Sequence, residues 1–217
     1  MGRLFLLDVI AATVVVGVWH FCFTRYNHRK GIKALRWVEA ACSNHGRVVE
    51  ARWMGPSRLQ AHLRFAAHWF ENARVTIRLL PRPLPMQWLL SLWHKQRETV
   101  TFEADLDYAP GIRLEVLRHR WLTHSSGKLA RKSRNWTVVR PGPVVLTTST
   151  EWGQELPPIV NALMTSHGHN LLSVRFRPES PHLAATVDLE ALSGEEAAAS
   201  FLGVVRDLAA GASASRQ

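Results

Sequence analysis

An apolar run of 20 residues, positions 4–23, constrains this chain more than any other feature of its sequence. Polar side chains interrupt the run only at Asp8, Thr13 and His20. A helix of about 20 residues can cross the hydrocarbon core of a bilayer, which is about 30 Å thick. The run therefore predicts a single N-terminal transmembrane helix that carries a globular domain behind it.

The flanks of this run favour a retained signal-anchor over a cleaved signal peptide. The run is longer than the 7–15 apolar residues typical of a signal peptide, and no small-x-small cleavage site follows it. One cation, Arg3, precedes it, whereas residues 25–33 carry four cations. The positive-inside rule then places the N-terminus outside and the domain in the cytoplasm. The Ala/Arg/Val-rich composition suggests a bacterial inner (plasma) membrane.

The inner end of the run has the side chains expected where a helix leaves a bilayer. Tryptophan and tyrosine collect at membrane interfaces, and cations are attracted to anionic headgroups by about 1 kcal/mol each. The expected anchor and interface residues are Leu4 and Phe23 at the two ends, the aromatic residues Trp19 and Tyr26, and the cations Arg25, Arg29, Lys30 and Lys33. A net charge of +10 would also suit nucleic acid, but no nucleic-acid module accompanies it, so lipid is the expected partner, together with a membrane protein.

Four segments follow from composition and periodicity. Residues 4–23 form the anchor, and residues 24–46 form a basic juxtamembrane helix. In that helix Ile32, Leu35, Val38 and Cys42 are spaced as the buried face of a helix. Residues 47–209 contain no Gly/Ser-rich linker and are therefore predicted to form one domain. Residues 210–217 are predicted to form a disordered tail.

The domain is expected to be α+β, with antiparallel β-hairpins and three to four packed helices. Apolar and polar residues alternate in several segments that Pro/Gly-rich turns separate. Hairpins are predicted between residues 47–54 and 59–65, 99–108 and 112–122, 136–140 and 144–150, and 171–177 and 182–189. Helices are predicted over residues 85–95 and 155–166 and after Ser193, with Phe201, Leu202, Val205 and Leu208 as the buried face of the last helix.

The segment at residues 85–95 is apolar almost all round, which permits two interpretations. Such helices are usually buried in a core, and this interpretation is favoured. The alternative is an interfacial helix in the headgroup layer that includes Trp88, Trp93 and Lys95, with its apolar face toward the lipid and its cations on the opposite side.

Candidate catalytic and metal-binding residues are few. Glu103, Asp105 and Asp107 alternate along one strand and could hold a cation, but a solvated face paired with Arg74, Arg78 or Arg113 is favoured. The histidines that could join such a site are His62, His119 and His124, and His167 and His169 form a close pair. No HExxH or CxxC spacing is present. We therefore expect no catalytic residue, no metal and no cofactor.

Three functions fit these features. The preferred one is a non-enzymatic, single-pass membrane protein whose cytoplasmic domain binds a protein or lipid at the membrane surface. The second is a carrier or sensor that holds an apolar ligand between sheet and helices. The third is a metal-dependent hydrolase with a composite Asp/Glu/His site. A large apolar cavity would favour the second, and convergence of carboxylates with histidines would favour the third.

Overall fold

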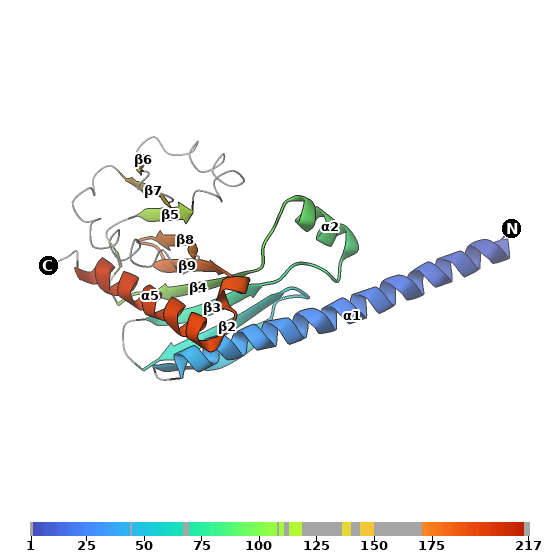
Figure 1. The fold of residues 1–217 in the computed structure, drawn as a ribbon, viewed down its shortest axis with the longest axis horizontal. Helices are drawn as coiled ribbons and strands as arrows, with labels where there is room; N and C mark the ends of the chain where they lie inside the picture. Colours follow the sequence, from blue (N-terminus) through green and yellow to red (C-terminus); the bar gives the residue numbers. More distant parts are fainter. Residues whose placement is uncertain are drawn as a thin grey trace.

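The fold, seen in a computed structural model, is α+β (Figure 1). The structure describes residues 2–43, 45–66, 70–107, 109–110, 113–118, 136–139, 144–149 and 171–214. The helices are α1 (Gly2–Cys42), α2 (Pro85–Trp93), the short 3-10 helix η4 (Leu189–Leu192) and α5 (Glu195–Ala214). The helix predicted over residues 155–166 lies outside the described residues.

All described strands belong to one antiparallel sheet. They are β1 (Gly46–Trp53), β2 (Arg58–Phe65), β3 (Glu71–Arg78), β4 (Thr99–Asp105), β5 (Leu114–Arg118), β6 (Trp136–Val139), β7 (Val144–Ser149), β8 (Leu171–Phe176) and β9 (Leu183–Asp188). The spatial order is β1-β2-β3-β4-β9-β8-β5-β7-β6. The chain therefore builds β1 to β4 in sequence order and then places its last two strands in the middle of the sheet.

Three of the four predicted hairpins are confirmed, namely β1–β2, β6–β7 and β8–β9. The predicted pairing of residues 99–108 with 112–122 is wrong. β4 pairs with β3 and β9, whereas β5 pairs with β7 and β8. Both β8 and β9 are largely buried, and a place between β4 and β5 gives each of them a neighbour on both sides.

The anchor segment and the basic segment form one uninterrupted helix, α1. Its buried face consists of Asn27, Gly31, Ala34, Val38 and Cys42. Ile32, which was predicted to lie on this face, is instead 42% exposed. The buried positions are mostly small because α1 lies close to the sheet: a Cβ added at Gly31 would lie 2.6 Å from the Trp53 ring. Small side chains, rather than the largest apolar ones, determine which side of α1 faces the domain.

The C-terminal half of α1 and the length of α5 cover one face of the sheet (Figure 1). Phe201, Val205 and Leu208 of α5 are buried, as predicted, and Leu202 is half-buried. They pack with the inward-facing residues of the strands, of which Phe102 is fully buried. α5 continues through Ala214, into the stretch that was predicted to be a disordered tail. Because α1 is fixed to the core over its second half, its first half has a defined direction away from the domain.

Candidate membrane-contact site

The N-terminal half of α1 projects beyond the rest of the protein (Figure 1). Within the described residues, α1 is the one helix long and apolar enough to cross a membrane, judged by length and composition. Its most apolar 18-residue window has a mean hydropathy of 2.0, and none of that window is buried. The exposed large apolar side chains of this half are Phe5, Leu6, Leu7, Val9, Ile10, Val14, Val15, Val16, Val18 and Phe21. In water this would be an unusually large apolar surface.

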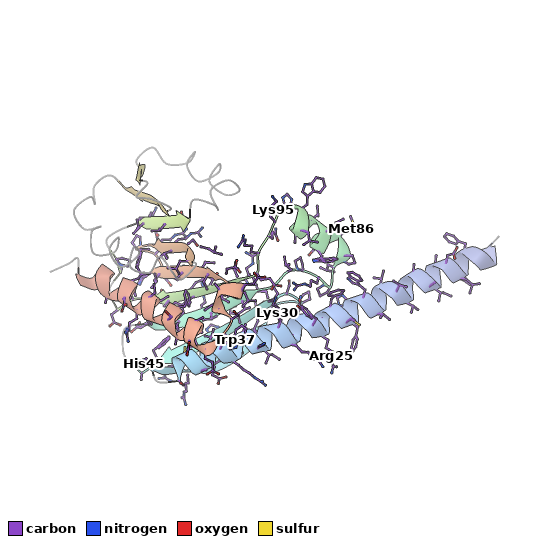
Figure 2. All side chains as sticks on the ribbon, in the orientation of Figure 1. Arg25, Lys30, Trp37, His45, Met86 and Lys95 are labelled. Carbon is purple, nitrogen blue, oxygen red and sulfur yellow. The ribbon has the colours of Figure 1, made fainter. Side chains whose placement is uncertain are left out.

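The second exposed apolar surface belongs to α2, which lies in the connection between β3 and β4 (Figure 2). The exposed fractions of its side chains reach 74% at Met86, 61% at Leu89 and 81% at Trp93, and Ser91 is its buried residue. The favoured interpretation of residues 85–95 as a core helix is therefore wrong. A helix that is apolar all round suits a protein core and a lipid environment alike, so its sequence pattern alone does not separate the two.

A cluster of three aromatic rings holds α2 against the end of the apolar run. The Trp88 ring centroid lies 5.7 Å from that of Trp19 and 6.1 Å from that of Phe23. Trp19 also donates a hydrogen bond from Nε1 to the carbonyl oxygen of Arg82, at 3.0 Å. The α2 surface is therefore fixed at the level of Trp19 and Phe23, where the predicted span ends.

A buried asparagine fixes the loop that precedes α2. Asn27 has no exposed surface, and its Nδ2 donates to the carbonyl oxygens of Pro56, at 3.1 Å, and Leu80, at 3.0 Å. Its Oδ1 accepts from Arg82, at 3.3 Å. All these bonds join α1 to loops next to the sheet. They satisfy an amide that would otherwise be costly to bury.

A buried carboxylate fixes the segment that follows α2. Glu98 is 7% exposed, and its two oxygens lie 2.5 Å from Arg82 Nη1 and 2.5 Å from Lys30 Nζ. Burial raises the pKa of the Glu98 carboxyl, but the hydrogen bonds from Lys30 and the backbone N–H of Leu80 and the charge of Arg82 outweigh it and hold the pKa below its ordinary value. We call Asn27, Lys30, Arg82 and Glu98 the polar clamp.

Four of the other predicted interface residues, Arg25, Tyr26, Arg29 and Lys33, lie on α1 just after the apolar run. Arg25 and Arg29 are exposed, and the Arg82 guanidinium lies 5.1 Å from the ring centroid of Tyr26. Lys33 lies over the Trp37 ring, at 5.3 Å. Lys95, just after α2, is exposed, and the side chain of Leu4 lies outside the described residues. The cations thus continue from the end of the apolar run toward the domain (Figure 2).

The acidic row on β4 is engaged by neighbouring side chains rather than gathered into a site. Arg74 on β3 pairs with Glu103 at 2.5 Å, and Asn72 donates to Asp105 at 3.1 Å. Asp107 lies beyond the end of β4 and is exposed. The pair of Glu103 with Arg74 is the cross-strand contact that the solvated-face interpretation predicts. The other predicted partners differ: Asp105 is met by an amide, and Arg113 pairs with Glu179.

No group of three metal-ligating side chains occurs among the described residues. His62 is exposed on β2, opposite Arg74 of β3. His119, His124, His167 and His169 lie outside the described residues. A hollow of about 380 Å³ beside β5 and β8 is lined mostly by charged side chains, five of its seven lining residues being arginine or glutamate. That lining does not suit an apolar ligand.

No family model matches the chain, and a search of the curated proteins returns no match. We therefore infer function from the surfaces of the chain itself.

Sequence reasoning missed three members of the polar clamp: Asn27, Arg82 and Glu98. Asn27 had a detectable signal, because it shares a helical face with Gly31, Ala34 and Val38 and is the one strongly polar residue on that face. Arg82 and Glu98 lie on opposite sides of α2 in the sequence, and no local pattern indicates that they meet.

Proposed function

We propose that this chain is a single-pass membrane-anchored protein whose C-terminal domain is a non-enzymatic binding module that works against the membrane surface. The membrane contact has two parts. The N-terminal half of α1 spans the bilayer, and α2 enters the leaflet on the domain side, next to the end of the span. The observation that carries the proposal is the exposed apolar surface of α2 at the level of Trp19 and Phe23.

The energetics favour lipid over water around α2. Burying a leucine or methionine side chain gains about 1.5–3 kcal/mol. Five large apolar side chains of α2 are exposed: Met86, Leu89, Leu90, Leu92 and Trp93. Their transfer into lipid contributes on the order of 5 kcal/mol or more. A helix as short as α2, with nine residues, is marginal by itself, so this gain also stabilises its helical form.

The orientation follows from charge. The cations of α1 lie on the domain side of the apolar run, which supports an N-terminus outside and a domain in the cytoplasm of an inner (plasma) membrane. With α1 continuous and clamped, there is no flexible linker over which the domain could move away from the bilayer. The domain therefore presents one defined side to the lipid.

Polar substitutions in α2 test its membrane contact. In full-length protein in nanodiscs, L89Q/W93Q is expected to speed hydrogen exchange of the α2 amides at least tenfold, because two large side chains lose their burial in lipid. Amides of β3 and β4 should keep the wild-type rates. Hydrogen–deuterium exchange resolved by mass spectrometry gives both sets of rates in one experiment.

The matched control replaces two apolar side chains that are exposed elsewhere. Val49 and Met54 are 60% and 57% exposed, at β1 and the turn after it. V49Q/M54Q should leave exchange in α2 unchanged. Equal exchange of α2 in wild type, L89Q/W93Q and this control would show that α2 does not contact lipid.

A further inference from the structure

A groove of about 510 Å³ lies between α1 and η4, on the basic part of α1. Its lining combines cations, aromatic rings and one carboxylate: Tyr26, Arg29, Lys33 and Trp37 from α1, and Glu190 and Ser193 from the η4 side. Such a mixture can contact both the charged and the carbon-bearing parts of a polar ligand.

Two of the lining cations have no acidic partner in the described part of the chain. Lys30, which also borders the groove, is held by Glu98 of the polar clamp. Arg29 and Lys33 form no ion pair among the described residues, and both are exposed. They are therefore available to an anion, and an arginine can contact a phosphate through two N–H groups at once.

The groove begins at the depth of the lipid headgroups. At a rise of about 1.5 Å per residue, Tyr26 lies about 4.5 Å beyond Phe23, Arg29 about 9 Å and Lys33 about 15 Å. The headgroup layer is about 5–8 Å thick on each side of the hydrocarbon core. Side chains of a helix lean toward its N-terminus, so that of Arg29 leans toward the membrane, whereas Lys33 lies over the Trp37 ring deeper in the groove.

We propose that this groove binds the headgroup of one anionic phospholipid that carries a hydroxyl group, such as phosphatidylglycerol. Arg29, with the charge of Lys33 behind it, holds the phosphate, the Tyr26 ring contacts the carbon atoms of the headgroup, and Glu190 accepts a hydrogen bond from its hydroxyl. This inference rests on the proposed membrane attachment, and it adds a specific lipid class to it.

Native mass spectrometry of the full-length protein in detergent, with phosphatidylglycerol added, tests the site. R29Q/K33Q is expected to weaken binding of the first phosphatidylglycerol at least tenfold, or about 1.4 kcal/mol. The control R36Q/R47Q removes the same charge from exposed positions outside the groove and should stay within about twofold of wild type. Thermal unfolding of both variants confirms that they fold.

Two further ligands test whether the groove binds an anionic lipid rather than any phospholipid or a free phosphate ester. Phosphatidylcholine, which has a phosphate but neither net charge nor a headgroup hydroxyl, should bind the first site at least tenfold more weakly. Glycerol 3-phosphate should not compete at concentrations where phosphatidylglycerol saturates the protein.

Several outcomes would overturn the proposal: equal weakening in both double variants, equal affinity for the two lipids, competition by glycerol 3-phosphate, or retention of an acidic protein in place of lipid. If the wild type binds no headgroup while the α2 amides remain protected in nanodiscs, the groove proposal fails alone. If the α2 amides are unprotected, the proposed membrane contact of α2 fails as well.

Discussion

Replacing Val14 and Val15 with arginine is expected to move the full-length protein out of the membrane fraction. Both side chains are exposed at the middle of the apolar run, 58% and 66% respectively. An arginine at the centre of a transmembrane helix costs about 2.5–3.5 kcal/mol for insertion, so V14R/V15R costs about 5–7 kcal/mol. Extraction of cell membranes with alkaline carbonate, followed by immunoblotting, measures the fraction that stays inserted.

The control for this pair carries the same change in charge outside the run. V49R/M54R places two arginines at exposed positions of the domain and should remain as resistant to carbonate as wild type. If V14R/V15R also stays resistant to carbonate, the N-terminal half of α1 is not the anchor.

The second large effect is expected at the polar clamp. E98Q removes the charge that Lys30 and Arg82 share and leaves two cations next to an amide. Breaking a buried ion pair costs about 3–5 kcal/mol, but Lys30 is 31% exposed, which reduces the figure to about 2–3 kcal/mol. Thermal unfolding of the full-length protein in detergent should show a midpoint lower by about 4–10 °C.

The pH dependence of stability provides an independent readout of the same carboxylate. Because the folded-state pKa of Glu98 is lowered, its contribution is fully present above its unfolded pKa, about 4.5, and is lost as the pH falls through the folded-state value. The wild-type midpoint should therefore fall on acidification from about pH 6 through this window. The midpoint of E98Q should fall less, because this variant lacks the titrating group.

The matched control is E103Q, which breaks the pair that Glu103 forms with Arg74. Both side chains are substantially exposed, 26% and 39%, so the cost should stay below about 1 kcal/mol. Equal losses in E98Q and E103Q would contradict a special role for the clamp.

Local patterns predicted the parts of the fold whose partners are close in the chain. The alternation at β2 and the turn before it were enough to predict the β1–β2 hairpin, and the spacing of Phe201, Val205 and Leu208 gave the buried face of α5. Each of these depends on one element or one short turn. Such features follow from side-chain periodicity alone.

Features that depend on distant residues were not predicted. The insertion of β8 and β9 between β4 and β5 requires pairing across about 80 residues, whereas the sequence pattern suggested a local hairpin of residues 99–108 with 112–122. The exposure of α2 was missed for a related reason. The sequence pattern of residues 85–95 is the same for an apolar surface that meets protein and for one that meets lipid. The position of α2 is decided by distant contacts, those of Trp88 with Trp19 and Phe23 and those of the polar clamp.

The central claim, that the protein contacts the bilayer through α2 as well as through α1, is tested most directly by measuring depth. A spin label is placed at position 90 with L90C in a C22S background. The remaining thiol, Cys42, is buried, and burial and the charge of Glu39 raise its pKa to about 11, so it reacts poorly with the label.

Collision rates with oxygen and with a water-soluble nickel complex are then compared in vesicles that contain the full-length protein. A label at V15C reports the middle of the apolar run, and a label at exposed R47C, on β1, reports water. If α2 lies in the bilayer, the label at position 90 meets oxygen more often than nickel, as the label at position 15 does. A label at position 90 that behaves like the one at position 47 would contradict the central claim.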